Sequence, residues 1–461
     1  MKFIFVRKTA GKDACPTLLL GLLVVLAASL AAQDTRNVTE PVIPTACSTL
    51  TAQLDVKLPE ADETKLDSER IQKAIDACPK GQAVELRGDA GHSAFLSGPL
   101  ELREGVTLLI DSGVVLLASR NPRDFDTTAG ACGVVSKSGR GCKPLIGVNG
   151  ANGAAVMGDG TIDGRGHAKL LGQNVTWWDL AEQARAGGSQ NCPRLIVTSH
   201  SNNFTLYRIT LKNSPNFHVV FGQGDGFTAW GVTIDTPGKG ARNTDGIDPS
   251  NATHVTITHC FIHTGDDNVA IKAGSGGPSA HFTISHNHFY AGHGMSVGSE
   301  TNGGLSAMRV SDLTIDGADN GLRIKSNITR GGLVHDVVYE DVCIRDTKNP
   351  IFMDPTYTAS VGPAKDLIPM FTGIEMHNVR ISGGGTITLK GLDKDHHLGI
   401  LFDGVAIAPA GTKYDNAHAD IQLGPGPVNF VPQGEDVNVT GKGGKGEVAS
   451  CEGKFVPMPK K

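Results

Sequence analysis

The chain has 461 residues, including 59 Gly; only 5% are aromatic, 19% are charged, and the formal net charge is −5 at pH 7. Apolar residues are spread evenly along the chain, which excludes a disordered protein, and the acidic balance argues against general nucleic-acid binding. Abundant Gly beside Val, Ile and Thr favours a turn-rich β protein over a helical one.

The first 31 residues have the pattern of a secretory signal. Basic residues precede the apolar run "LLLGLLVVLAASLAA", and the small residues Ser29 and Ala31 fit a cleavage site. An uncleaved anchor helix is the alternative. We expect a signal peptide at 1–31, a linker at 32–45 and one domain at 46–461. The protein should therefore be secreted, to the periplasm or beyond, and no later stretch is long and apolar enough to span a membrane.

The stretch "DSERIQKAIDAC" predicts a short helix that caps the N-terminal end of the domain. Its apolar residues recur at helical spacing, and Ser68 or Asp67 offers an N-cap. The residues on the predicted buried face are Ile71, Ala74, Ile75 and Cys78. A solenoid needs such a cap because its terminal repeat has no neighbour on one side.

Eight cysteines follow the signal, and an exported chain can oxidise them. Eight cysteines allow 105 pairings, so the sequence does not fix the connectivity. The two pairs close in sequence, Cys47–Cys78 and Cys132–Cys142, are the predicted disulfides. No C-x-x-C pair occurs, so a zinc site is not expected.

The middle of the chain repeats with a period of roughly 26 residues, in the range of solenoids. Each unit holds short alternating stretches separated by Gly, Asn or Asp, and none has a helical pattern. The repeats begin at Phe204, Phe227, Val255, Phe282, Met308 and Val334. Propeller blades need longer units, so the pattern predicts an all-β, single-domain parallel β-helix.

Aligning the repeats places polar residues in one column. We align on the first inward apolar residue of each unit: Ile247, Val269, Met295 and Leu322. The residues two positions earlier are then Asp245, Asp267, His293 and Asn320. Because neighbouring rungs stand about 4.8 Å apart, these residues should lie close together.

The parity of this column predicts a bend. In a straight strand Asp267 would point inward with Val269, and a buried unpaired carboxylate is very costly. Gly246, Asn268 and Gly294 follow the column directly, so the chain should turn there. A turn can bring Asp266 and Asp267 to one surface.

The resulting cluster suits glycoside hydrolysis. Neighbouring carboxylates raise the pKa of at least one of them, which supplies an acid beside ionised partners. Asp266 lies one position off the column and is the predicted general acid, while Asp245 and Asp267 would hold the water. Arg323 and Lys325 alternate with inward Leu and Ile and should point outward, which implies an anionic sugar such as a uronate. A structural Asp/Asn ladder with a solvated cationic face is the alternative.

Four segments carry a family likeness: "NTDGID", "GDDNVAIK", "GHGMSVGS" and "LRIKS". In this order and spacing they resemble the signature segments of the polygalacturonases, glycoside hydrolase family 28. The resemblance implies a right-handed parallel β-helix that hydrolyses α-1,4-galacturonosyl bonds of pectate with inversion and without a metal or cofactor. It implies that His293 supports the ionisation of the acid and that Arg323, Lys325 and Tyr357 bind substrate. The motifs look like the endo-acting bacterial branch.

Other functions remain open at this point. They are hydrolysis of rhamnogalacturonan or xylogalacturonan, Ca²⁺-dependent pectate lysis, and non-catalytic carbohydrate binding. A binding module needs no proton donor, so the intact acid trio favours an enzyme. The expected partner is a pectic polysaccharide, with no nucleic acid and no membrane, and the protein is expected to act as a monomer. The adjacent Trp177 and Trp178 suit either sugar stacking or packing.

Overall fold

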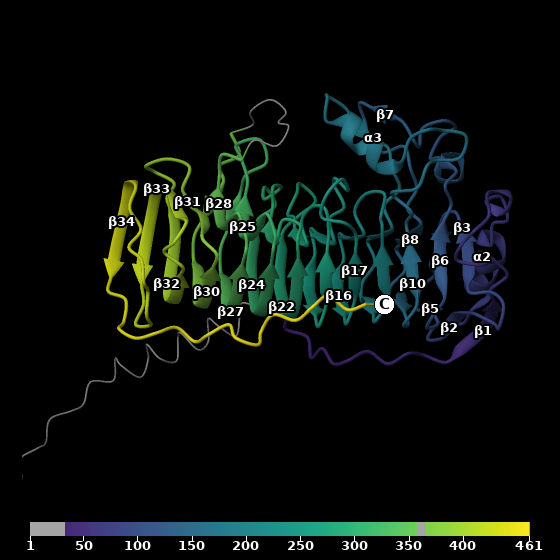
Figure 1. Cartoon of the computed structure of the whole chain (residues 1–461), viewed down its shortest axis with the longest axis horizontal. Helices are drawn as coiled ribbons and strands as arrows, with labels where there is room; N and C mark the ends of the chain where they lie inside the picture. The colour runs from purple at the N-terminus through teal and green to yellow at the C-terminus, as the bar shows by residue number, and fades with distance from the viewer. Residues whose placement is uncertain (1–32, 358–365, 461) are drawn as a thin grey trace, which may run out of the picture.

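The computed structural model describes residues 33–357 and 366–460, and the chain forms one long coil of parallel strands (Figure 1). The expected signal peptide at 1–31 lies outside the described residues. The predicted fold class, an all-β right-handed parallel β-helix, is confirmed. Its strands form three stacks, and each turn of the chain contributes to the stacks in succession.

The first stack runs the whole length of the coil and pairs in parallel register. Its strands are β1 (Ala46–Thr51), β2 (Ala83–Arg87), β5 (Thr107–Ile110), β9 (Ala155–Met157), β13 (Phe204–Tyr207), β16 (Asp225–Trp230), β19 (Thr253–Thr258), β22 (Ser279–Tyr290), β24 (Leu305–Asp316), β27 (Val337–Arg345), β30 (Ile374–Ser382), β32 (Leu398–Ile407), β33 (Thr412–Leu423) and β34 (Glu435–Gly441).

The second stack lies beside it and merges into the long strands β22, β24 and β27. Its own strands are β3 (Ala94–Ser97), β6 (Val115–Ala118), β10 (Thr161–Asp163), β14 (Thr210–Lys212), β17 (Thr233–Asp235) and β20 (Phe261–His263). A merged strand means that the chain passes from one stack to the next without a turn.

The third stack carries the column predicted from the repeats. Its strands are β4 (Leu100–Glu101), β8 (Ile146–Asn149), β12 (Ile196–Ser199), β15 (Val219–Gly222), β18 (Ile247–Ser250), β21 (Val269–Ile271), β23 (Met295–Val297), β25 (Asn320–Lys325), β28 (Asn349–Asp354), β31 (Gly385–Lys390) and the first part of β33. Two short strands, β26 (Leu333–Val334) and β29 (Met370–Phe371), also pair in parallel.

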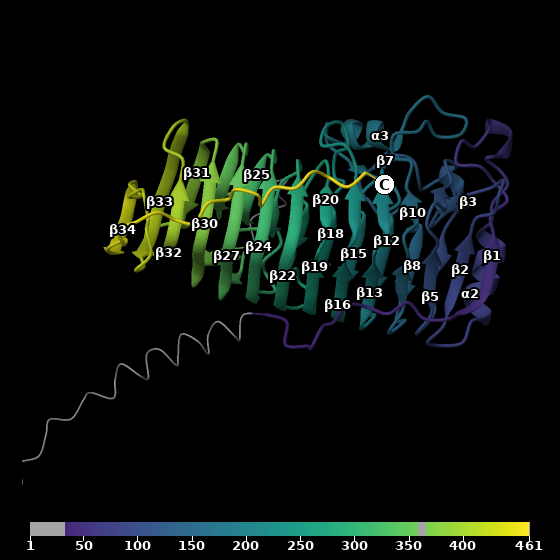
Figure 2. The same ribbon diagram turned by 60° about the horizontal axis from the view of Figure 1, so that its bottom comes forward.

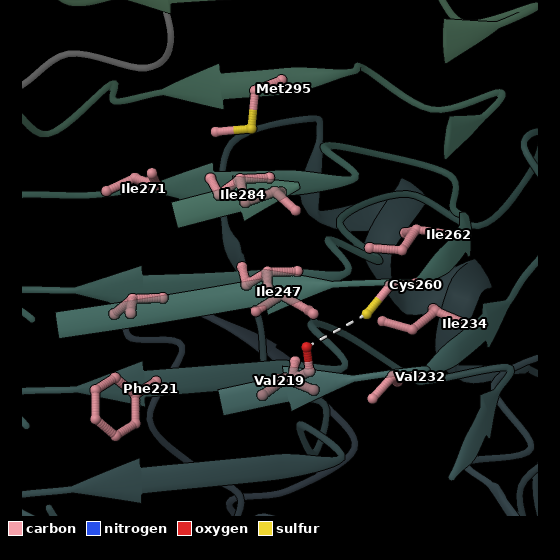
Figure 3. Close-up of a cluster of buried hydrophobic side chains, with 14 of the residues drawn as sticks. Val219, Phe221, Val232, Ile234, Ile247, Cys260, Ile262, Ile271, Ile284 and Met295 are labelled. Atoms are coloured by element: carbon pink, nitrogen blue, oxygen red, sulfur yellow. Dashed lines mark hydrogen bonds between the residues drawn. The ribbon is translucent and has the colours of Figure 1, made fainter. Parts of the chain in front are cut away.

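The core fills the inside of the coil with one layer of apolar side chains per rung. Figure 3 shows Phe221, Ile247, Ile271 and Met295 among these layers, all fully buried. Each rung stacks like residues on the next, so burial is continuous along the axis and has no separate domain boundary. Cys260 is also buried here, and its thiol contacts backbone carbonyls.

The N-terminal cap forms as predicted. Helix α2 (Ser68–Ala77) has Asp67 as its N-cap residue, and Ile71 and Ile75 are fully buried against the first rung. Asp67 does not cap with its side chain. Its carboxylate instead accepts from the backbone N–H of Leu96 at 2.9 Å and from Arg70, which fixes the helix on the end of the coil.

The structure has three disulfides among the described residues. Cys47–Cys78 and Cys132–Cys142 are the two predicted pairs, and both are confirmed. The third, Cys343–Cys451, was not predicted because its partners are 108 residues apart. It fastens the C-terminal tail, which runs back along the coil past β24 and β22 (Figures 1 and 2).

The segment expected to be a linker belongs to the domain, which corrects the boundary at residue 46. Asp34 accepts from Thr256 at 2.7 Å, Arg36 donates to the carbonyl of Phe227, and Tyr207 donates to Glu40 at 2.7 Å. The segment therefore crosses successive strands of the first stack (Figure 2). Polar side chains on the outer face of those strands anchor the segment. The alignment of repeats could not predict this, because it describes contacts between rungs and not contacts with a segment outside them.

An inserted unit stands above the third stack on one side (Figure 1). It contains helix α3 (Trp177–Ala184) and the antiparallel pair β7 (Val135–Ser136) and β11 (Ser189–Gln190). Trp177 is buried edge-on against Phe125, and Trp178 donates its indole N–H to the carbonyl of Ser214 at 3.0 Å. The packing role of this pair is thus the one observed. No helix among the described residues has the length and apolarity to cross a membrane.

Candidate active site

A cleft of about 670 Å³ lies over strands β15 to β25 of the third stack. Its floor holds the predicted carboxylates Asp245, Asp266 and Asp267 together with His293. The inserted unit supplies one wall through Ala184 and its neighbours, and Tyr357, just after β28, lies at the other side. The sequence thus predicted the floor of this cleft.

The strand register confirms the column. Ile247 pairs with Val269, Val269 with Met295, and Met295 with Leu322. The residues two positions earlier therefore stack from rung to rung. Asp245, Asp267 and His293 all precede the first residue of their strands, so the chain is bent where the parity required it.

The bend has a clear local cause at Asn268. Its buried side chain donates to the carbonyl of Ile262 at 3.0 Å and accepts from the backbone N–H of Gly294 at 2.8 Å. Gly294 has a φ of 70°, and a Cβ there would lie 2.2 Å from the Gly321 carbonyl oxygen. Glycine is required at this point because the next rung approaches closely.

Asp267 is a fixed anion at the centre of the floor. One oxygen accepts from Ser296 at 2.7 Å and from Arg323 at 3.0 Å, and the other accepts from Lys325 at 2.7 Å. Burial raises the pKa of Asp267, but the charges of Lys325 and Arg323 lower it by more. The pKa of this carboxyl is therefore held well below its usual range. Asp267 is therefore ionised and has little freedom to move.

Asp266 is the most accessible carboxylate of the trio, with 18% of its side chain exposed against 2% for Asp267. Its Oδ1 lies 2.9 Å from Nδ1 of His293. Burial raises the pKa of Asp266, but the hydrogen bond from His293 and the charges of His293 and Lys325 together outweigh it, so the net direction is downward. Burial lowers the pKa of His293, but the same bond and the charge of Asp266 raise it overall, so the pair holds its proton on the imidazole.

Asp245 differs from the other two acids of the trio because its pKa is shifted upward. Burial and the charges of Asp248 and Asp266 raise its pKa well above the ordinary value. Its Oδ1 has no hydrogen-bond partner within the described structure, and its Oδ2 lies 3.5 Å from Nζ of Lys272. The expectation that repulsion would keep a proton on Asp266 therefore needs correction. The contact with His293 lowers the pKa of Asp266, whereas the long contact with Lys272 does not offset burial and repulsion at Asp245.

Arg323 and Lys325 lie on the predicted face but are not solvent-exposed. Only 5% of Arg323 and 6% of Lys325 are accessible, and both donate to Asp267. The Tyr357 ring covers them, at 5.2 and 5.4 Å from the two cationic groups. Alternation predicted their direction correctly, whereas their burial depends on a loop that alternation does not describe. Lys325 and Tyr357 line the cleft.

Asp248 and Lys272 are among the site residues that were missed. Nζ of Lys272 lies 2.5 Å from Asp248 and packs 4.3 Å from the centre of the Phe217 ring. Burial raises the pKa of Asp248 to about 6 although Lys272 lowers it. The repeat alignment could have found both residues. Asp248 stacks in the same outward column as Arg323, and Lys272 stacks in the same outward column as Lys325.

The ligand-type atoms of Asp266, Asp267 and His293 lie close enough to hold a metal ion. Their charges do not suit one, because Arg323 and Lys325 already occupy the oxygens of Asp267. A divalent ion would have to displace both cations. The arrangement instead offers proton transfer between acids of different ionisation, beside cations that attract an anion.

A coil of parallel strands with such a cluster in an open cleft defines a carbohydrate-active enzyme of the β-helix class. Residues 61–421 match the family described as Glycosyl hydrolases family 28, and the chain belongs to it. It is 45% identical to an endo-polygalacturonase of Pectobacterium carotovorum subsp. carotovorum, over 81% of this chain and 90% of that one. It is 40% identical to a polygalacturonase of Ralstonia nicotianae, over 92% of each chain.

Among solved structures the chain is similar to the polygalacturonase from Erwinia carotovora ssp. carotovora. The TM-score is 0.79 at 40% sequence identity, covering 89% of this chain and 100% of that one. This likeness extends over the coil that carries the candidate site.

Proposed function

We propose that the protein is a secreted endo-acting hydrolase of the α-1,4-galacturonosyl bonds of polygalacturonate, and that it inverts the anomeric configuration. The observation that carries the proposal is the trio Asp245, Asp266 and Asp267 on the floor of a cleft, with cations directly beneath it. Relatives named polygalacturonase and endo-polygalacturonase support the substrate and the endo mode.

In this proposal Asp266 protonates the leaving oxygen, and Asp245 with Asp267 orients and activates the water. Accessibility favours Asp266 as the acid, since it is the carboxylate that a sugar in the cleft can reach. Asp267, fixed by three donors, is an acceptor with a constant orientation. His293 acts on Asp266 by holding or releasing the proton between them.

The proton positions of the unliganded site have to change when substrate binds. The charge of Lys325 lowers the pKa of Asp266 and Asp267. A uronate carboxylate at Lys325 neutralises that charge and adds a negative one, so the pKa of Asp266 rises as substrate enters. In the proposed cycle the proton of Asp245 passes to Asp266, so Asp245 becomes the base as Asp266 becomes the acid. Binding of the anionic substrate thereby favours the protonated form of Asp266, the proposed acid.

The chemistry of the cleft suits a polyanion. Five cationic residues line it: Arg185, Arg194, Arg242, Lys272 and Lys325. The chain is acidic overall, yet these arginines and lysines gather in the cleft. They give it a positive potential where an anionic polymer would lie. Neutral polysaccharides gain nothing from this arrangement.

Secretion is supported by the three disulfides, because such bonds form and persist in oxidising compartments. The N-terminal pattern at 1–31 predicts the export route. Mass spectrometry of the protein recovered outside the cytoplasm tests this: cleavage near residue 31 is expected, and an intact N-terminus would contradict it.

Product analysis on polygalacturonate tests the activity. Mixed oligogalacturonates with saturated ends are expected early in the reaction. Galacturonate monomer alone would refute the endo mode, and unsaturated ends would identify a lyase. Turnover of rhamnogalacturonan or xylogalacturonan without turnover of polygalacturonate would overturn the substrate assignment. Binding without any product would leave a carbohydrate-binding module.

A further inference from the structure

A second histidine–aspartate column lies at the C-terminal end of the coil, away from the cleft. His397 directly precedes β32, His418 lies within β33 and Asp436 within β34. The residues after them pair in register, since Leu398 aligns with Ala419 and Ala419 with Val437. The three side chains therefore stack over three successive rungs.

The potential ligand atoms of this column converge on one point. Oδ2 of Asp436 lies 2.9 Å from Nε2 of His397 and 3.0 Å from Nδ1 of His418. All three residues offer one ligand atom within 4.8 Å of the others. Two imidazole nitrogens and one carboxylate oxygen are a common donor set for first-row divalent metals.

The other ring nitrogen of His397 fixes which atom faces the column. Nδ1 lies 3.1 Å from Oδ1 of Asp420, and that oxygen also accepts from Asn438 at 2.9 Å. With the proton on Nδ1, the lone pair of Nε2 points at the carboxylate of Asp436. Two acceptors then face each other, and either a second proton or a metal ion can lie between them. A carboxylate behind a ligand histidine is the usual outer support of a metal site.

We propose that His397, His418 and Asp436 bind one divalent transition-metal ion of the Zn²⁺ type. The ligands are Nε2 of His397, Nδ1 of His418 and a carboxylate oxygen of Asp436, with water in the remaining position. The side chains are 15%, 26% and 37% exposed, so an ion and its water can reach them.

The surroundings are compatible with an added positive charge. A depression of about 390 Å³ adjoins His397 and Asp420 and also contains Lys394. Lys394 is paired with Asp395 at 2.9 Å, so its charge is already balanced. The ion pairs of Asp436 within the described residues are with the two histidines alone.

The ion would serve as a clamp on the last rung. Strand β34 is the terminal strand of the stack, and most of its residues are exposed. An edge strand with so little burial frays easily. A metal shared by the β32, β33 and β34 rungs joins this strand to the two before it, far from the proposed catalytic residues.

Metal binding by the full-length mature protein tests the proposal. After treatment with EDTA and its removal, Zn²⁺ is titrated at pH 7.5 by calorimetry, and the melting temperature is recorded with Zn²⁺ and with Mg²⁺. One tight Zn²⁺ site is expected, with a Tm increase of several degrees that Mg²⁺ does not produce. Absence of tight Zn²⁺ binding by the unmodified protein would overturn the proposal.

Variants locate the site. His418→Gln and Asp436→Asn are expected to lose the tight site and the Tm increase, and also the visible bands of bound Co²⁺. His377→Gln is the matched control, because His377 contacts Glu375 and Asp403 but no second imidazole in the described structure. Circular dichroism confirms folding of each variant. Tight binding that survives in folded His418→Gln, or is lost in His377→Gln, would refute the assignment.

Discussion

The coil carries two columns of histidine and aspartate, and they differ in what lies beneath them. In the cleft, Asp267 is buried and neutralised by Arg323 and Lys325. At the C-terminal end, Asp436 is exposed and contacts only His397 and His418 among the described residues. The same stacking of histidine and aspartate over successive rungs thus yields a proton-transfer site in one place and a metal-binding geometry in the other. The fixed cations Arg323 and Lys325, two rungs beyond Asp267, make the difference.

The largest effect is expected from removing the proposed acid. Asp266→Asn keeps the shape and the contact with His293 but cannot give a proton, so kcat on polygalacturonate should fall by about 10²- to 10⁴-fold. Binding of oligogalacturonate, followed by calorimetry, should persist. Asp235→Asn is the control, since Asp235 also pairs with a histidine, His263, outside the cleft. Retained turnover in Asp266→Asn would remove Asp266 as the acid.

The next largest effect is expected from removing Lys325, one of the two cations that bind Asp267. Lys325→Met leaves Asp267 with fewer donors, and its pKa should rise because Lys325 lowers it. The acidic limb of the kcat/KM profile should therefore move to higher pH, with a loss of roughly 10- to 100-fold at its optimum. Lys348→Met, at an exposed pair with Asp319, should change neither. An unmoved acidic limb would show that Asp267 does not titrate in the reaction.

A smaller effect on stability should accompany Asp245→Asn. The pKa of Asp245 is raised in the folded protein, so its protonated form stabilises the fold below the unfolded pKa of about 3.9, and this stability is lost as pH rises. Asn mimics the protonated form at every pH. The variant should melt a few degrees above the unmodified protein at pH 7.5, with a smaller difference at pH 5, and should be inactive. The exposed carboxylate variant Asp415→Asn should show no such pH dependence. A lower Tm at pH 7.5 would contradict the direction of this shift.

The smallest effect on turnover is expected from chelation. EDTA should leave kcat unchanged, because the proposed catalytic groups are all side chains with fixed cations. It should lower the Tm of the Zn²⁺-loaded protein if the distal column, His397, His418 and Asp436, holds the ion. Loss of activity that Ca²⁺ restores would favour a lyase and would contradict metal-free proton transfer in the cleft.

Much of the cleft could be predicted from sequence because its rungs keep a regular period. The register of Ile247, Val269 and Met295 follows from simple alignment, and so does the meeting of Asp245 with Asp267. Burial of Arg323 could not be predicted, since alternation gives a direction but not the position of Tyr357. Ionisation also escaped prediction, because it depends on which donor reaches which oxygen.

The C-terminal end was less predictable because its rungs are irregular. His418 and Asp436 are only 18 residues apart, and β33 pairs within two stacks. Alignment at a fixed period therefore misses the distal column. The disulfide Cys343–Cys451 was missed for a related reason, since the chain after β34 leaves the repeat and returns along the coil.

In the proposed reaction Asp266 protonates the leaving oxygen on one side of an α-galacturonosyl bond, while Asp245 and Asp267 direct a water molecule to the opposite side. The most direct test is proton NMR of oligogalacturonate during the first minutes of hydrolysis, before mutarotation. With inversion, the new reducing end appears first as the β-anomer. First appearance of the α-anomer would indicate a covalent intermediate and refute the inverting mechanism.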